Sequence, residues 1–209
     1  MVRALEPIER WVIFRTNHGT DAHLRKVESI SEVRPYHPVI VKGTVSKPPR
    51  IIPRRHVIFT IKDETGEVDC AAYEPTGSLR KIARRLMIGD LVEAYGGVRP
   101  PSEKNPLTIN LEKLKILRLA PKISYMNPPC PKCGKRMKSM GRGKGYKCTK
   151  CGYKDPKATK VVEELPSLVD PGIYIPSPRA YRHLTRPRRR FGLMNKRSIS
   201  YIFKPWHYP

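Results

Sequence analysis

Long apolar runs are absent from this 209-residue chain, and acidic residues are few. No stretch approaches the roughly 18 consecutive apolar residues of a membrane-spanning helix, so we expect no membrane partner. The first residues, Met1 to Pro7, contain no apolar signal core, which argues against secretion and favours a cytoplasmic protein. Only 18 acidic residues stand against 42 basic ones, which excludes an acidic solvating tail.

Cysteine is also scarce, and four of the five cysteines form two close pairs. Two residues separate the cysteines of each pair, fourteen residues separate the pairs, and a glycine follows each pair. This spacing lets both thiolates of a tight turn face one ion, and two such turns complete a tetrahedral four-sulfur site. The pattern predicts a structural zinc in preference to an iron centre or a redox pair; its ligands are Cys130, Cys133, Cys148 and Cys151. Cys70 stands alone in a strand-like run, where we expect a buried apolar side chain.

The formal net charge of +24 is concentrated in the second half of the chain. Residues 122–160 carry twelve basic residues and one acidic residue, and residues 161–209 carry nine and three. Uncompensated charge of this size repels itself, so a polyanionic partner is favoured over a merely solvated basic surface.

Residues 39–121 carry strong strand signals. Strands are expected at Val39–Val45, Val57–Ile61, Val68–Tyr73, Leu91–Val98 and Leu107–Leu119, with a helix through Leu79, Ile82, Ala83 and Leu86 that ends at Gly89-Asp90. Gly43 suggests a bulge or tight bend, and Lys47-Pro48-Pro49-Arg50 is expected to open a loop. Three strands, a helix and two strands are typical of a five-stranded OB-fold barrel, which binds nucleic acid across one face and two loops.

We therefore expect a mainly β protein with four parts. Residues 1–38 precede an OB-fold nucleic-acid-binding domain at 39–121, a zinc ribbon at 122–160 and an extended basic C-terminal arm at 161–209. Near the N-terminus, Trp11–Phe14 predicts a buried strand. In the arm, basic residues alternate with Tyr174, Tyr181, Phe191, Tyr201 and Trp206, which suits a clamp along a phosphate backbone, although a disordered basic tail is the alternative.

The candidate nucleic-acid contacts are basic residues of the expected loops, the ribbon and the arm. They are Lys47, Arg50, Arg54, Arg55, Arg99, Lys104, Arg142, Lys144, Arg179, Arg182, Arg188, Arg189 and Arg190. Phe59, Tyr73 and Tyr95 offer base-stacking surfaces, unless they pack in the core.

Two segments carry a family resemblance. The run from Phe14 to Leu24, FRTNHGTDAHL, resembles the signature near the end of the ferredoxin-like domain of archaeal tRNA(Ile) 2-agmatinylcytidine synthetases. The stretch from Tyr174 to Leu184 is similar to the tail motif of that family. In the family, an OB domain, a zinc ribbon and a basic arm follow in this order, so residues 1–38 correspond to the remnant of a ferredoxin-like domain.

The resemblance implies a function and its partners. The family enzyme is a ligase that consumes ATP and joins agmatine to the wobble cytidine of an isoleucine tRNA. The family's kinase-like domain has no counterpart here, so we expect the chain to be the tRNA-binding C-terminal half. ATP and Mg are then expected only with a separate N-terminal catalytic half. The alternative is a free-standing OB and zinc-ribbon protein that binds single-stranded nucleic acid.

The residues of the N-terminal turn have two interpretations. We expect no catalytic residue in this chain, but the resemblance makes His18, Gly19, Thr20, Asp21 and His23 candidate contributors to a substrate site. Asp21 is able to hold a cation such as agmatine, and either histidine is able to move protons. The alternative is a hydrogen-bonded turn in which Asp21 caps neighbouring backbone groups.

Overall fold

The computed structural model describes residues 7, 10–12, 16–192 and 207–208. Strand β1 (Trp11–Val12) pairs with β14 (His207–Tyr208). Trp11 and Val12 are 36% and 44% exposed, so the prediction that they are buried was wrong, because a two-stranded ribbon alone has no layer to cover it. The remainder of that predicted strand, residues 13 and 14, and the arm aromatics Tyr201 and Trp206 lie outside the described residues.

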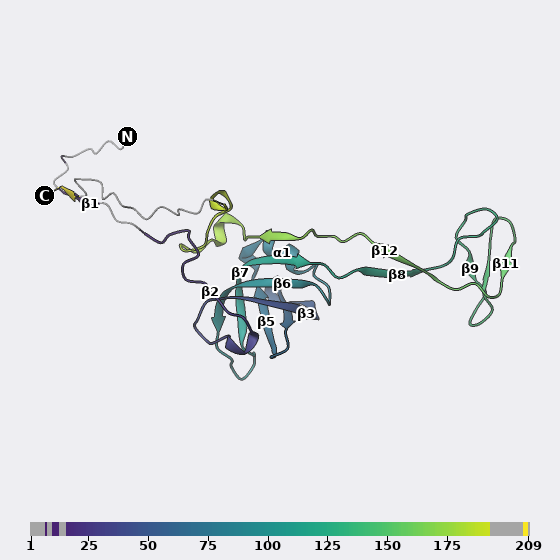
Figure 1. The fold of residues 1–209 in the computed structure, drawn as a ribbon, viewed down its shortest axis with the longest axis horizontal. Helices are drawn as coiled ribbons and strands as arrows, with labels where there is room; N and C mark the ends of the chain where they lie inside the picture. Colours follow the sequence, from purple (N-terminus) through teal and green to yellow (C-terminus); the bar gives the residue numbers. More distant parts are fainter. Residues whose placement is uncertain (1–6, 8–9, 13–15, 193–206, 209) are drawn as a thin grey trace.

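Five strands and one helix form the predicted OB fold (Figure 1). Strand β3 pairs with both β4 and β6, and β7 pairs with β6 and, over three residue pairs, with β5. The strand pairings therefore close around the core, and the pairing between β5 and β7 is the shortest of them. The elements are β3 (Val39–Ile52), β4 (His56–Lys62), β5 (Glu67–Ala72), α1 (Ser78–Ala83), β6 (Leu91–Arg99) and β7 (Thr108–Arg118).

Alternation of small apolar residues produces this core. Val39, Val41 and Val45 of β3 are at most 2% exposed, and Val92 and Ala94 of β6 are fully buried. Successive side chains of a strand point to opposite faces, so each strand covers the barrel interior with every second residue. Among the buried residues, Cys70 is fully buried as predicted, and burial raises the pKa of its thiol well above its ordinary value.

Strand β3 differs from its prediction. Lys47–Arg50 is not a loop: β3 continues to Ile52, and its pairing with β4 shifts register between Val45 and Lys47 and again between Lys47 and Arg50. Pro48 and Pro49, which lie between Lys47 and Arg50, cannot donate ladder hydrogen bonds, and the second register shift accommodates them. Gly43 is not at a bulge; a Cβ there would lie 3.1 Å from the Cβ of Ile61, so the glycine permits close approach of β4.

Helix α1 closes one end of the barrel but is shorter than predicted. It ends at Ala83, after which the N–H groups of Arg85 and Leu86 donate to carbonyls three residues back, those of Ile82 and Ala83, at 2.8 and 3.4 Å. Leu79, Ala83 and Leu86 are nevertheless buried in the barrel core. The helical spacing therefore identified the buried side correctly while overestimating the length of the helix.

Short elements flank the barrel. Strand β2 (Arg25–Lys26) adds parallel to β3, and β13 (Gly172–Tyr174) adds antiparallel to β7. The remaining short turns of 3₁₀-helix are η1 (Ile30–Glu32), η2 (Pro53–Arg55), η3 (Glu74–Thr76), η4 (Pro178–Ala180) and η5 (Arg188–Arg190). Ser177 N–H donates to the Thr76 carbonyl at 3.1 Å, so the described part of the tail packs on the barrel.

A two-stranded ladder connects the barrel to the ribbon. Strands β8 (Lys122–Met126) and β12 (Val161–Leu165) pair antiparallel, and Figure 1 shows the ribbon at the far end of this ladder. The ribbon itself contains β9 (Lys138–Ser139), β10 (Tyr146–Lys147) and β11 (Lys154–Asp155). Within the described part of the chain, no helix is long and apolar enough to span a membrane.

Candidate metal centre and nucleic-acid interface

The four paired cysteines converge in the ribbon. Their Sγ atoms all lie within 4.8 Å of one another, and Cys130–Cys151 and Cys133–Cys148 are 3.5 and 3.4 Å apart. A tetrahedral zinc with Zn–S bonds of about 2.3 Å would separate its sulfurs by roughly 3.8 Å. The cysteine arrangement therefore fits a four-thiolate zinc.

Two similar turns present these thiols. Gly134 and Gly152 N–H groups donate to the carbonyls of Cys130 and Cys148 at 2.8 and 3.1 Å, and both glycines have φ above +70°. Such left-handed positions favour glycine, which explains the residue after each pair. Backbone N–H groups of Cys151 and Lys150 donate toward Cys148 and lower the pKa of its thiol, whereas contact with the neighbouring thiols raises the pKa of Cys151. At Cys148, backbone hydrogen bonding thus favours the thiolate that zinc requires.

The predicted N-terminal turn and the tail lie against each other. Gly19 and Asp21 N–H groups donate to the carbonyls of His183 and Leu184, each at 2.9 Å. The Arg190 guanidinium donates to the His18 carbonyl at 2.7 Å. The two segments that carry the family resemblance, far apart in sequence, are therefore neighbours in the fold.

Asp21 holds this junction together through its carboxylate. One oxygen accepts from the ammonium of Lys113 in β7, and the other accepts from the Arg186 N–H at 2.7 Å. The Lys113 side chain is 1% exposed; burial lowers its pKa, and the bond to Asp21 opposes that effect. Both oxygens of Asp21 are thus engaged inside the chain, but by partners 92 and 165 residues away rather than by the neighbouring backbone groups that the capping interpretation expects.

His23 is similarly engaged. Its Nε2 lies 2.9 Å from the buried carboxylate of Glu112, which also accepts from the Thr185 hydroxyl at 3.3 Å. Thr20 donates to the Asn17 carbonyl at 2.6 Å. His18 differs, because its ring stacks on that of His183 at 5.7 Å and borders an open cavity.

That cavity, the tail pocket, combines residues of the turn and the arm. Its volume is about 560 Å³, and its lining residues are His18, Gly19, Tyr181, Arg182, His183, Thr185, Pro187, Arg188, Arg189 and Arg190. Arg188 and Arg189 are exposed, so their guanidinium groups are available to an anionic ligand. Four of the predicted nucleic-acid contacts and two candidate substrate residues therefore share one surface.

The other predicted basic contacts are dispersed. Lys47 and Arg50 lie on β3 and pair with Glu67 and Asp69 at 2.7 and 2.9 Å, so carboxylates already compensate these two charges. Arg179 lies 3.5 Å from Glu74 across an exposed contact. The remaining predicted contacts of the loops and the ribbon are all exposed; they are Arg54, Arg55, Lys104, Arg142 and Lys144.

The suggested stacking aromatics are only partly accessible. Phe59 is 1% exposed and packs in the barrel core, so its stacking interpretation was wrong. Tyr73 and Tyr95 are half-buried, with hydroxyls that donate to Asn110 and Glu93, each at 3.0 Å. Arg99 ends β6, and its guanidinium donates to the Thr108 hydroxyl at 3.4 Å.

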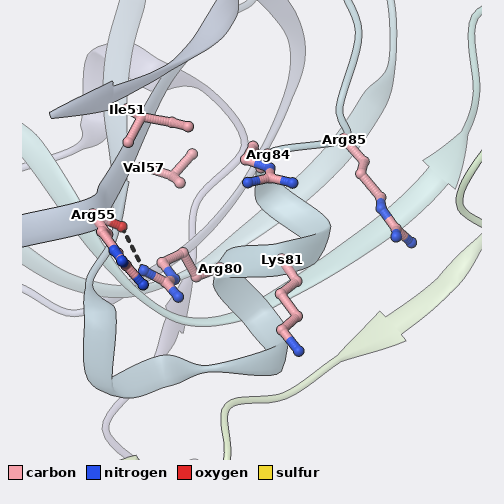
Figure 2. Close-up of a pocket in the computed structure, with 7 residues that line it drawn as sticks. All are labelled: Ile51, Arg55, Val57, Arg80, Lys81, Arg84 and Arg85. Atoms are coloured by element: carbon pink, nitrogen blue, oxygen red, sulfur yellow. Dashed lines mark hydrogen bonds between the residues drawn. The ribbon is translucent and has the colours of Figure 1, made fainter.

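Sequence reasoning missed a second cationic cavity beside α1. We call it the α1 cleft; its volume is about 520 Å³, and it is lined by Ile51, Arg55, Val57, Arg80, Lys81, Arg84 and Arg85 (Figure 2). The available signal was the pair of basic dipeptides at positions 80–81 and 84–85, four residues apart. That spacing stacks them on one side of a helix.

Two family models match this chain. Residues 127–166 match the model described as the TiaS C-terminal zinc ribbon domain, and residues 39–117 match the OB-fold nucleic acid binding domain. The resemblance inferred from the turn and the tail is thereby supported by two independent parts of the chain.

Full-length relatives match over most of this chain. The isoleucine-tRNA 2-agmatinylcytidine synthetase TiaS of Staphylothermus marinus is 52% identical over 192 residues, which is 92% of this chain and 42% of the relative. The synthetase of Thermofilum pendens is 45% identical over 92% of this chain and 43% of its own length. The chain thus spans about two fifths of the curated relatives it matches.

Solved structures give the same result. A crystal structure of apo TiaS has a TM-score of 0.69 and 41% identity, covering 83% of this chain and 40% of its own. A complex of TiaS with its isoleucine tRNA and ATP has a TM-score of 0.66 and 40% identity, covering 83% of this chain and 39% of its own. The resemblance of this chain to the C-terminal half of the family is confirmed.

Proposed function

We propose that this chain is the tRNA-binding portion of an ATP-dependent ligase that attaches agmatine to the wobble cytidine of an isoleucine tRNA. The observation that carries the proposal is identity of 40% or more, along at least 83% of the chain, to synthetases of that name and to one solved with its isoleucine tRNA. The OB fold and the net charge of +24 give independent support, because both suit a polyanionic partner.

The proposed division of work follows from the geometry. The tail pocket and the exposed arginines of the β3–β4 connection contact phosphates of the tRNA, and Arg142 and Lys144 extend these contacts to the ribbon. A structural zinc on the four cysteines stabilises the ribbon, whose own buried cluster is small. Contacts of this kind contribute to catalysis by holding the tRNA in a fixed orientation.

ATP and Mg act, in this proposal, with the part of the synthetases that this chain does not match. Phosphoryl chemistry needs lysine, backbone amides or magnesium carboxylates arranged around the phosphates. No carboxylate lines the tail pocket among the described residues, and the carboxylates of Asp21 and Glu112 behind it are already engaged by Lys113 and His23. His18 and Gly19, which border the pocket, are the turn residues we propose to face the substrate site.

A competition experiment tests the tRNA assignment. The chain is bound to labelled isoleucine tRNA and challenged with unlabelled isoleucine tRNA or single-stranded DNA. We expect the tRNA to compete at much lower concentration, and the reverse order would instead favour a free-standing single-strand binder. The logarithm of the affinity should fall steeply and linearly with the logarithm of the salt concentration, because phosphate contacts release counterions.

The tail pocket is tested by neutralising Arg188→Gln and Arg189→Gln together. The matched control is Arg34→Gln with Lys42→Gln, which removes the same charge from two exposed positions outside the tail pocket. The tail variant should reduce the slope of log affinity against log salt by about 1 to 2, and the control by less. Equal effects of the two variants would contradict a specific role of the tail pocket.

A further inference from the structure

The α1 cleft and the tail pocket are two separate cavities. Its walls are the β3–β4 connection on one side and α1 with the following turn on the other, and no lining residue is common to both cavities. Figure 2 shows Arg84, directly after α1, near Val57 and Ile51, whereas the side chains of Lys81 and Arg85 extend away from these two residues.

Five cationic side chains line this cleft without a carboxylate partner. Among the described residues, no ion pair involves Arg55, Arg80, Lys81, Arg84 or Arg85. Like charges gathered around one cavity repel one another. Lys47 and Arg50, by contrast, have acidic partners on the same barrel. The uncompensated charge of the cleft is therefore a cost to the free protein that an anionic ligand would relieve.

Two of the guanidinium groups are held in place. Arg80 donates to the Arg55 carbonyl at 2.8 Å, which ties α1 to the β3–β4 connection, and Arg85 donates to the Leu168 carbonyl at 3.3 Å. These bonds use only part of each guanidinium, which has five N–H donors. The remaining donors face the cleft or solvent in restricted positions, which lowers the entropy lost when a ligand binds.

The floor of the cleft is apolar. Ile51 is 57% exposed, and Val57, its directly opposite partner in the β3–β4 ladder, is buried. An exposed isoleucine surrounded by guanidinium groups suits a ligand with both an apolar face and several negative charges. A ribose and its flanking phosphates have that combination.

We propose that the α1 cleft binds the sugar–phosphate backbone of an RNA strand, as a second RNA-contacting surface beside the tail pocket. RNA is favoured over a free nucleotide because Arg55 belongs to the β3–β4 connection, one of the two loops that OB folds use for oligonucleotides. The cleft thus extends that path from the connection onto α1. This inference rests on the proposed function, since it assumes that the bound polyanion is RNA.

The test uses the full chain and the substitutions Lys81→Gln and Arg84→Gln together. Neither side chain makes a hydrogen bond among the described residues, and glutamine keeps a comparable helix propensity, so the fold should be retained. Thermal unfolding checks this directly. The Arg34→Gln and Lys42→Gln variant is again the control of equal charge. If the double variant unfolds early, Lys81→Gln alone replaces it.

The measurement is tRNA affinity over a range of salt concentrations. Loss of two phosphate contacts should reduce the salt slope by about 1 to 2 and weaken binding several-fold more than the control does. RNA carrying 4-thiouridine should also cross-link to the peptide that contains Ile51 or to that containing Arg84. A variant indistinguishable from the control, or cross-links confined to the tail and ribbon, would overturn the inference.

Further arms separate this result from other outcomes. If the unmodified chain does not bind tRNA, the proposed function fails first. If it binds tRNA with a salt slope that the cleft variant leaves unchanged, only the cleft assignment fails. A third arm adds millimolar ATP. If ATP binds the unmodified chain but not the cleft variant, and does not displace tRNA, the cleft is a free-nucleotide site and the RNA assignment is overturned.

Discussion

The Lys113–Asp21 pair is the residue-scale link between the barrel, the N-terminal turn and the tail. Lys113 comes from β7, its side chain is 1% exposed, and its ammonium lies 5.6 Å from the centre of the Phe191 ring. A buried ammonium requires a counter-charge, because desolvation of an unpaired ion costs several kcal/mol. Asp21 provides that charge and simultaneously accepts from Arg186.

We predict that Asp21→Asn loosens the part of the tail between Arg182 and Arg190, while β13 stays paired with β7. The substitution keeps the shape but leaves Lys113 without a counter-ion, so the free energy of unfolding should fall by about 3 kcal/mol. Thermal or urea unfolding measures the loss, and limited proteolysis should show faster cleavage between Arg182 and Arg190.

The control for this prediction is Glu28→Gln, which removes an exposed partner 3.6 Å from Lys26. Exposed pairs contribute about 0–1 kcal/mol, so this variant should resemble the unmodified chain. If Asp21→Asn also has no effect on stability or proteolysis, Asp21 is free to act in ligand binding, as the cation-holding interpretation would require.

At the scale of elements, the zinc ribbon and the barrel are stabilised differently: the ribbon depends on its metal, and the barrel on its apolar core. Its buried cluster consists of Cys130, Met137, Tyr146 and Cys148, whereas the barrel buries more than twenty residues in one cluster. So small an apolar cluster cannot offset the entropy of ordering its loops. Binding of the metal supplies the missing free energy.

We predict one tightly held zinc per chain and local unfolding when Cys148→Ser removes a ligand. Metal analysis should then find little zinc, and amide exchange in residues 127–160 should become fast, while the barrel amides stay protected. A chelator should have the same effect on the unmodified chain. The matched control is Cys70→Ser, which should retain zinc although it perturbs the barrel core. Iron with visible absorption, or a ribbon that remains protected without metal, would contradict the prediction.

The sequence predicted those elements that local patterns specify. Alternating small apolar residues located β3 and β6, and the cysteine spacing located the metal ligands, because both signals are contained in a few neighbouring residues. The extension of β3 through Pro48 and Pro49 was missed, since it depends on register shifts against β4. Local composition at Lys47–Arg50 favours a loop, and tertiary pairing overrides it.

Long-range contacts of the site were beyond the sequence. Nothing near Asp21 indicates that its partners are Lys113 and Arg186, because these contacts join segments separated by 92 and 165 residues. The α1 cleft was missed for a different reason. Basic residues on a short helix are usually solvated, and only the approach of Arg55 and Ile51 makes them walls of a cavity.

The whole molecule is elongated. The barrel carries the tail on one side, and the β8–β12 ladder holds the ribbon away from it (Figure 1). Basic surfaces therefore occur at the tail pocket, at the α1 cleft and on the ribbon, where Arg142 and Lys144 are exposed. Such spacing suits several contacts along one large polyanion rather than one deep site for a small anion.

If one tRNA spans these surfaces, each chain must bind one tRNA. The contributions of the surfaces to the slope of log affinity against log salt must then add. We predict that the tail substitutions at Arg188 and Arg189, combined with the cleft substitutions at Lys81 and Arg84, lower the slope by about the sum of the two separate reductions. Distant surfaces with no shared partners are expected to be additive in this way. Titration by fluorescence anisotropy across salt concentrations gives the slopes, and calorimetry gives the number of tRNA molecules per chain. Two tRNA molecules bound per unmodified chain, with each variant abolishing one of them, would mean that the tail pocket and the cleft act on different molecules.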